Sequence, residues 1–125
     1  MRIILFTLLF LLSACGEQGP GGAEPKGIRP SDADIAYARS AQPEDEALAS
    51  IYNRSCRNCH AVAGVNAPLT GHLAAWEPRL AQRSRDGLLQ STRSGYRAMP
   101  AQGLCRQCSD EDFLALIDFM LTPPD

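Results

Sequence analysis

Two stretches of the chain carry apolar residues at the spacing of an amphipathic helix, one before residue 55 and one at the carboxyl end. The first helix is predicted to start at Pro43, because proline suits the first helical position and the acidic residues after it complement the helix dipole. The second is predicted to start at Ser109, a typical N-cap, and to stop at Pro123. The apolar faces are Ala47, Leu48, Ile51 and Tyr52 in the first helix and Phe113, Leu114, Leu116, Ile117, Met120 and Leu121 in the second. We expect these two helices to cross.

Shorter helical patterns fill the region between them. They predict one helix around residues 73–82 and another around 86–93, the second ending at Gly95. No stretch alternates apolar and polar residues with the period of a strand, and there is no internal repeat. We therefore expect residues 44–125 to form an all-α domain of about four helices joined by loops.

The amino-terminal residues 1–14 have the pattern of an export signal. A single positive charge at Arg2 precedes an apolar run, residues 3–12, that is too short to span a bilayer. The segment ends in Leu-Ser-Ala before Cys15, which resembles the bacterial lipobox and predicts that Cys15 is lipidated after cleavage. The alternative is an ordinary signal peptide with an unrelated cysteine near the cut. Gly16 after the lipid cysteine resembles lipoproteins of the outer membrane, although that rule varies between bacteria.

Residues 15–43 have the composition of a linker. Glycine, proline and alanine dominate, and few positions can contribute to a core. Residues 31–40 can form a short helix, but their few apolar positions assign them to the tether as well. The segment is predicted to act as a flexible tether between the lipid and the domain.

The run Cys56-Arg57-Asn58-Cys59-His60 is the strongest chemical signal of the chain. Two cysteines three apart, followed at once by histidine, form the attachment motif of a c-type haem, in which both sulfurs bond the porphyrin and the histidine ligates the iron. A chain of 125 residues with 45% hydrophobic residues builds one small domain, and a covalent haem would supply much of its core. The alternative is a redox or zinc Cys-x-x-Cys pair that happens to precede a histidine.

The opposite face of such a haem decides between electron transfer and an open coordination site. Met99 is the candidate ligand, because it precedes a proline that favours extended backbone in an irregular stretch. By spacing alone, a buried packing methionine is an equal alternative. Met1 belongs to the signal, and Met120 lies on the apolar face of the last predicted helix. His72 is a weaker candidate, since a histidine at a loop or helix start is usually solvated.

From residue 47 to 120 the chain resembles a class I cytochrome c, and within that class the small c5 group of bacterial monohaem cytochromes. Four blocks carry the resemblance: Ile51-Tyr52-Asn53 before the haem motif, Ala67-Pro68, Ala75-Trp76-Glu77-Pro78-Arg79, and the segment from Met99-Pro100 through Cys105-Arg106-Gln107-Cys108 to Glu111. The resemblance implies the class I cytochrome c fold, wrapped around one covalent haem c. It does not extend to the tether or the lipobox, which put free diffusion in doubt.

The resemblance also implies roles for individual residues. Met99 matches the sixth iron ligand, and Cys105 and Cys108 match a pair that forms a small disulfide loop. Pro68 matches the proline whose carbonyl accepts a hydrogen bond from the ligating histidine, a contact that orients the ring. Trp76 and Arg79 match positions beside the haem and near a propionate.

Each of these residues has a plainer alternative. Pro68 can be a loop proline, Trp76 a core residue and Arg79 a solvated one. A zinc site of four cysteines and a thioredoxin-like redox pair are alternatives for Cys105 and Cys108. The zinc site leaves the histidine and methionine of the haem hypothesis without a role, and the redox pair lacks a βαβ context.

We therefore expect a one-electron carrier rather than an enzyme, serving a bacterial respiratory chain in the periplasm while anchored to a membrane by its lipid. Its partners would be redox proteins such as a terminal oxidase, a reductase or a quinol-oxidising complex, with no nucleic acid and no small-molecule substrate. The net charge is −2, yet arginines dominate between residues 47 and 108, and Arg57 and Arg97 suggest a positive rim that attracts an acidic partner. The alternative is a solvated arginine-rich surface. The second functional class is a haem sensor or a peroxidase-like enzyme with a labile methionine ligand.

Overall fold

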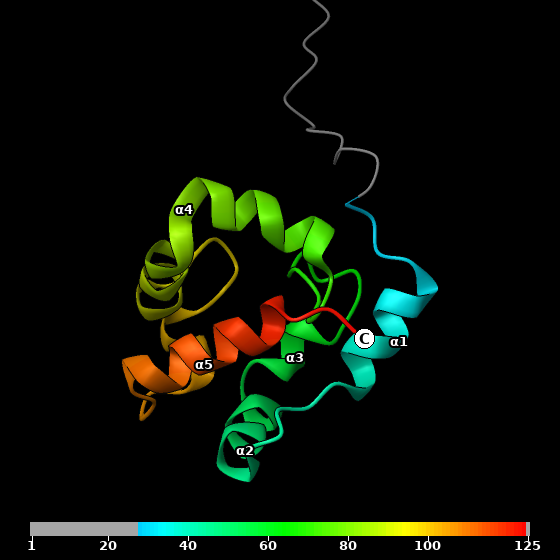
Figure 1. The fold of residues 1–125 in the computed structure, drawn as a ribbon. Helices are drawn as coiled ribbons and strands as arrows, with labels where there is room; N and C mark the ends of the chain where they lie inside the picture. The colour runs from blue at the N-terminus through cyan, green and yellow to red at the C-terminus, as the bar shows by residue number, and fades with distance from the viewer. Residues whose placement is uncertain (1–27, 125) are drawn as a thin grey trace, which may run out of the picture.

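The computed structural model describes residues 28–124, so the predicted signal segment 1–14 and Cys15 lie outside the described residues. The elements are α1 (Asp32–Ser40), α2 (Glu46–Arg54), α3 (Arg57–His60), α4 (Leu73–Ser94), the 3-10 turn η1 (Ala101–Leu104) and α5 (Asp110–Leu121) (Figure 1). Residues 28–124 contain no strand beyond one isolated bridge, which agrees with the predicted all-α class. None of the helices in this part of the chain combines the length and the apolar character needed to cross a membrane.

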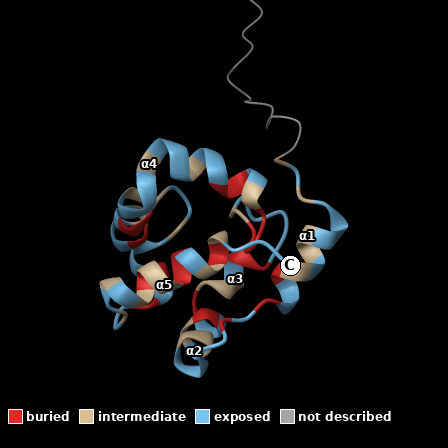
Figure 2. Ribbon diagram, viewed as in Figure 1, coloured by how far each residue is buried: buried red, intermediate tan, exposed pale blue. Residues whose placement is uncertain are grey.

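Helix α5 forms where the sequence predicts it. Ser109 is its N-cap, and a capping box joins the Ser109 side chain to the Asp112 backbone and the Asp112 side chain to the Ser109 backbone. The apolar face of α5 then supplies much of the core, and buried positions are concentrated along this helix in Figure 2. Its buried residues are Phe113, Leu116, Ile117 and Met120.

Helix α2 packs against α5, as predicted, but begins at Glu46 rather than at Pro43. The reason is the cap: the Asp45 carboxylate accepts a hydrogen bond from the Leu48 amide at 2.8 Å, so Asp45 rather than the proline ends the preceding coil. Tyr52 is fully buried, and its ring meets that of Phe119 edge-on at 5.0 Å.

Helix α4 combines the two shorter helices that the sequence predicts. Ser84 lies inside it with non-helical backbone (φ +61°, ψ 172°), so two helical halves meet at a break. The Ser84 hydroxyl accepts a hydrogen bond from the Gly87 amide at 3.4 Å and thereby caps the second half. The helix ends at Gly95 (φ +83°), where a Cβ atom would lie 3.0 Å from the Ala101 nitrogen.

Helix α1 lies in the segment that the linker composition assigns to the tether. A capping box between Ser31 and Asp34 starts the helix, and Ala38 is fully buried. The Tyr37 ring rests on Gly71, and the Arg57 guanidinium donates a hydrogen bond to the Arg39 carbonyl. The linker-like composition of this segment gives no sign of the docking, in which Ala38 is buried and Tyr37 lies against Gly71. From α1 onward the described part of the predicted tether is therefore packed on the domain.

Candidate haem-binding site

The two cysteines of the motif lie on one short turn. Cys56 is the N-cap of α3, and its carbonyl accepts hydrogen bonds from the amides of Cys59 at 3.2 Å and His60 at 2.9 Å. Both thiols are unpaired; Cys56 is half-buried and Cys59 is exposed. Burial raises the pKa of the Cys56 thiol, which keeps it protonated near neutral pH. This turn presents two thiols and an imidazole within five consecutive residues.

His60 is the best-defined side chain of the site. It is only 6% exposed, and its Nδ1 atom lies 2.7 Å from the Pro68 carbonyl oxygen. A carbonyl oxygen can only accept, so Nδ1 carries the proton and the lone pair of Nε2 is left for a metal. Burial lowers the pKa of His60, which favours the neutral ring that a metal requires. The donor set therefore fits a haem iron.

The loop after α3 is bonded both to His60 and to Trp76, whose ring lies beside the imidazole. The Thr70 amide donates a hydrogen bond to the His60 carbonyl at 2.8 Å, and the Trp76 indole N–H donates to the Leu69 carbonyl at 2.8 Å. The Trp76 ring is nearly parallel to the imidazole, with centroids 5.6 Å apart. The structure thus brings Pro68 and Trp76, two of the residues singled out in the sequence, against His60.

Arg79 lies close to this group but its guanidinium is engaged within its own helix. Its Nη1 atom donates to the Ala75 carbonyl at 2.5 Å, and the side chain is half-buried. Its positive charge contributes to the lowered pKa of His60. Arg79 also lines a hollow with Pro68 and His72, next to the amino-terminal segment.

Met99 lies in the segment between the end of α4 and η1, apart from the residues around His60 in the sequence. Its backbone forms a two-bond bridge with Tyr96, in which the Tyr96 amide donates to the Met99 carbonyl at 3.0 Å and the Met99 amide donates to the Tyr96 carbonyl at 2.9 Å. Pro100 after it is extended (ψ 155°). The Met99 methyl group passes close to Gly103, where an added Cβ would lie 3.4 Å from it. Met120, by contrast, is packed in the core with Tyr52 and Trp76.

Cys105 and Cys108 form a disulfide that closes the turn between η1 and α5, with Cα atoms 5.5 Å apart. Cys105 is 1% exposed and packs against Leu88, Leu89 and Phe113. Because both sulfurs are used in this bond, the arrangement leaves none for a four-cysteine zinc site. Within residues 28–124, no three His, Cys, Asp or Glu side chains gather in a way that would hold a metal ion.

His72 differs from the solvated side chain that the sequence suggests. It is 6% exposed and serves as the N-cap of α4, although its side chain makes no capping hydrogen bond. Ile35 of α1 lines the same hollow as His72.

The pattern of the sequence does not predict one pair of side chains that supports the site, Tyr52 and Thr70. The Tyr52 hydroxyl and the Thr70 hydroxyl are hydrogen-bonded at 2.8 Å, and both side chains are fully buried. The bond links α2, before the motif, to the loop that holds His60. Burial raises the pKa of Tyr52. In the sequence, Tyr52 fits the apolar face of its helix, and a lone threonine in a loop gives no sign of a partner 18 residues away.

The amino-acid sequence of this domain is similar to those of known proteins. Residues 43–120 match the protein family described as "Cytochrome C oxidase, cbb3-type, subunit III". Cytochrome c5 of Azotobacter vinelandii is 44% identical over 71 residues, which cover 56% of this chain and 86% of that protein. Cytochrome c5 of Ectopseudomonas mendocina is 38% identical over 71 residues, covering 56% of this chain and 82% of that protein. Cytochrome c-555 of Chlorobaculum tepidum is 39% identical over 58 residues, covering 43% of this chain and 53% of that protein.

These matches and the motif on α3 lead to the same conclusion. The chain carries one covalent haem c, for which Cys56, Cys59 and His60 are the attachment motif. It is a small electron carrier and not an enzyme. The chain belongs to the family of c-type cytochrome domains that matches residues 43–120, as a monohaem class I cytochrome of the c5 group.

Proposed function

We propose that this cytochrome shuttles single electrons in a bacterial respiratory chain outside the cytoplasm, with His60 and Met99 as the axial ligands of its iron. Cys56 and Cys59 hold the haem through thioether bonds. The observation that carries the assignment of His60 is its hydrogen bond from Nδ1 to the Pro68 carbonyl, because this bond leaves Nε2 as the metal-binding nitrogen. The bound haem supplies the redox chemistry, in which iron alternates between ferrous and ferric states.

The protein residues orient and insulate the group. The Pro68 carbonyl keeps the His60 ring in one tautomer and one orientation, and the hydrogen bond raises the basicity of the ring. Trp76 packs parallel to the ring and is itself fixed by its bond to Leu69. Arg79 contributes positive charge nearby. We assign Pro68, Trp76 and Arg79 these supporting roles.

We assign Met99 as the second axial ligand because it matches the sixth ligand of the family and the backbone around it is fixed. The Tyr96 bridge and Pro100 fix the backbone on both sides of the methionine. A thioether ligand together with histidine gives a high reduction potential, which suits delivery of electrons to a terminal acceptor. The disulfide between Cys105 and Cys108 then closes the far end of the loop that contains Met99.

The test of the ligand assignment is the visible spectrum of the oxidised and reduced holoprotein. We expect haem that remains attached after denaturation and the weak far-red band of methionine sulfur on ferric haem. Met99→Ala should abolish the band, while Met120→Leu, a change at the buried core methionine, should leave it intact. A band that survives in Met99→Ala, or is absent from the unmutated protein, would refute Met99 as the ligand. Rapid binding of carbon monoxide by the reduced unmutated protein would favour the sensor or enzyme alternative.

We propose the periplasm as the location and a lipid on Cys15 as the anchor. Both rest on the sequence of residues 1–15, namely the short apolar run and the lipobox-like end. The test is labelling of the expressed chain with radioactive palmitate, followed by separation of membrane and soluble fractions. We expect label and membrane association for the unmutated chain and neither for Cys15→Ala. Membrane association of an unlabelled chain would refute the lipid anchor.

The partner is proposed to be an acidic redox protein, such as a terminal oxidase, a reductase or a quinol-oxidising complex. Arg97 is exposed in the Met99 loop, which we define as residues 95–104, whereas Arg57 is engaged by the Asn53 side chain and the Arg39 carbonyl. Electron transfer to an acidic acceptor should therefore slow as ionic strength rises, and Arg97→Ala should reduce the slope of that dependence more than Arg57→Ala. An electron-transfer rate that is flat or rises with salt would refute electrostatic docking at the Met99 loop.

A further inference from the structure

The Met99 loop is built from unfavourable backbone conformations. Arg97 (φ +55°), Gln102 (φ +60°) and Leu104 (φ +69°) all lie in the left-handed region without being glycine. Such conformations are sparsely populated for ordinary residues, so local preference does not hold the segment in place. At Gly95 an added Cβ would lie 3.0 Å from the Met99 carbonyl oxygen, so the loop also packs tightly on its own start. Contacts from outside the loop must therefore stabilise it.

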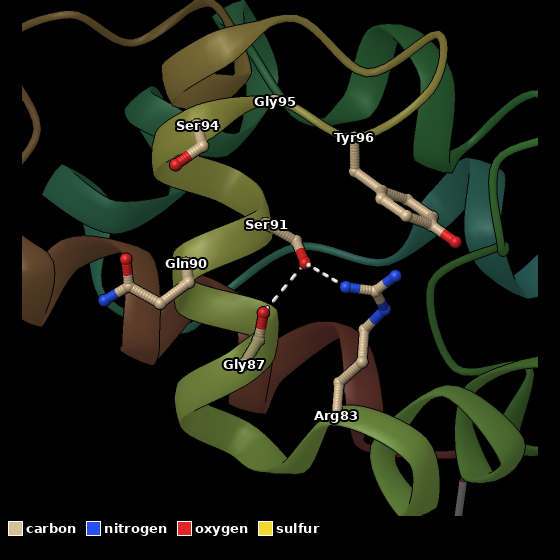
Figure 3. Close-up of a pocket in the computed structure, with 7 residues that line it drawn as sticks. All are labelled: Arg83, Gly87, Gln90, Ser91, Ser94, Gly95 and Tyr96. Carbon is tan, nitrogen blue, oxygen red and sulfur yellow. Dashed lines mark hydrogen bonds between the residues drawn. The ribbon is translucent and has the colours of Figure 1, made fainter.

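Arg83 makes the clearest of these outside contacts. Its guanidinium carbon lies 4.1 Å from the centre of the Tyr96 ring, within the range of a cation–π interaction. Tyr96 is the bridge partner of Met99, so the ring that Arg83 covers belongs to the residue whose backbone holds the methionine. Figure 3 shows the Arg83 side chain extending from α4 beneath this ring.

A second contact fixes the position of Arg83 itself. Its Nη1 atom donates to the Ser91 hydroxyl at 3.3 Å, and Ser91 in turn donates to the Gly87 carbonyl at 2.8 Å (Figure 3). Arg83 is the last residue before the break at Ser84, and Ser91 lies in the following half of α4. The side chain therefore spans the break and reaches the loop.

Among residues 28–124, the Arg83 guanidinium forms no ion pair with a carboxylate. Two other arginines of α4, Arg85 and Arg93, are paired with Asp118 at 2.6 Å and Asp110 at 3.1 Å. Arg97 also faces the Tyr96 ring, but its guanidinium carbon is farther away, at 5.2 Å. The described contacts of the Arg83 guanidinium thus include the Tyr96 side chain and the Ser91 hydroxyl.

We propose that Arg83 is a positioning residue for the axial methionine: its guanidinium, anchored on Ser91 and stacked on Tyr96, keeps the Met99 loop closed. The inference rests on the proposed ligation of iron by Met99. Removal of the guanidinium should raise the fraction of molecules in which the loop has released the methionine. A partly exposed cation–π contact corresponds to roughly a two- to fivefold change in that fraction.

The experiment is the rate of carbon monoxide binding to the reduced holoprotein, since the gas needs the position that the methionine vacates. Arg83→Ala should bind carbon monoxide about two- to fivefold faster than the unmutated protein, the increase given by loss of a cation–π contact. Tyr96→Ala should have a similar effect, Tyr96→Phe should have none, and the double variant Arg83→Ala/Tyr96→Ala should equal either single one. Arg93→Ala, an arginine of the same helix paired with Asp110, is the matched control and should leave the rate unchanged.

The outcomes separate this inference from the ligand assignment. If Met99→Ala speeds carbon monoxide binding but Arg83→Ala does not, Met99 is the ligand and Arg83 does not position it. If the effects of Arg83→Ala and Tyr96→Ala on the rate of carbon monoxide binding add independently, the stacked contact does not cause the increase. If Met99→Ala leaves the rate unchanged, the ligand assignment fails and the role of Arg83 fails with it. Unfolding of Arg83→Ala and Arg93→Ala in guanidinium chloride measures any general loss of stability. Equal losses of unfolding free energy with different rates of carbon monoxide binding would support the positioning role.

Discussion

Substitution of Gly71 by alanine should test whether α1 is part of the folded domain. Gly71 has φ +80°, and an added Cβ would lie 2.3 Å from Tyr37 Cε1 and 2.6 Å from Tyr37 Cδ1. It would also lie 3.3 Å from the Thr122 carbonyl oxygen. The Gly71 amide is held in place by a hydrogen bond to the Met120 carbonyl at 2.9 Å, so the backbone cannot easily move away. Either the Tyr37 ring must leave or the loop must distort.

The expected loss of unfolding free energy in Gly71→Ala has two parts. Left-handed backbone costs alanine about 1–2 kcal/mol relative to glycine. Forcing a methyl group into the ring adds overpacking, which typically costs about 1–3 kcal/mol. Gly71→Ala should therefore lower the free energy of unfolding by about 2–5 kcal/mol. In a Tyr37→Ala background the second part disappears, so the double variant should be about 1–3 kcal/mol more stable than the sum of the single effects predicts.

Guanidinium chloride unfolding of the holoprotein, followed by far-ultraviolet circular dichroism, measures these differences. Gly64→Ala is the matched control, because Gly64 has φ +88° and nothing lies within 4 Å of an added Cβ, so only the backbone part should be lost. Strict additivity of Gly71→Ala and Tyr37→Ala, or equal losses for Gly71→Ala and Gly64→Ala, would refute the docking of α1 on this loop.

Three further changes test other supports of the fold. Thr70→Val should cost about 1–3 kcal/mol of unfolding free energy, because the buried Tyr52 hydroxyl loses its partner; Thr70→Ser should restore most of it. Ser109→Ala should cost about 1 kcal/mol by removing the cap of α5, measured by the same unfolding assay. The Ser31 hydroxyl and amide hold the pKa of Asp34 below its usual value, so its carboxylate stabilises the fold above the unfolded pKa of about 3.9 and loses this effect as pH falls. Asp34→Asn should thus destabilise at neutral pH, with a smaller difference near pH 2–3, as unfolding at several pH values would measure.

Each of these three predictions has a result that would contradict it. Equal stability of Thr70→Val and Thr70→Ser would mean that the hydroxyl pair contributes nothing. An unchanged midpoint for Ser109→Ala would assign the start of α5 to the neighbouring disulfide rather than to the cap. A difference for Asp34→Asn that grows on acidification would have the wrong sign for a lowered pKa.

Local patterns in the sequence were enough to predict the class of fold and its cofactor. The motif from Cys56 to His60 is five consecutive residues, and α5 has its cap, apolar face and terminator within one segment, so neither depends on distant contacts. The family match confirms the haem. Met99 as the sixth ligand and Cys15 as the lipid anchor stay predictions, the first because ligation is not tested by the fold and the second because Cys15 lies outside the described residues.

Only the tertiary structure decided how the site is supported. The hydroxyl of Thr70 on Tyr52 and the stacking of Arg83 on Tyr96 join residues 18 and 13 positions apart. Residue type and local periodicity do not encode such pairings, since each depends on where the intervening backbone leads. The docking of α1 is the clearest case: its composition is that of a linker, and it joins the domain because Gly71 leaves room for one tyrosine ring. The sequence by itself therefore determined the cofactor and the helices, while packing determined which side chains hold the ligands and where the domain begins.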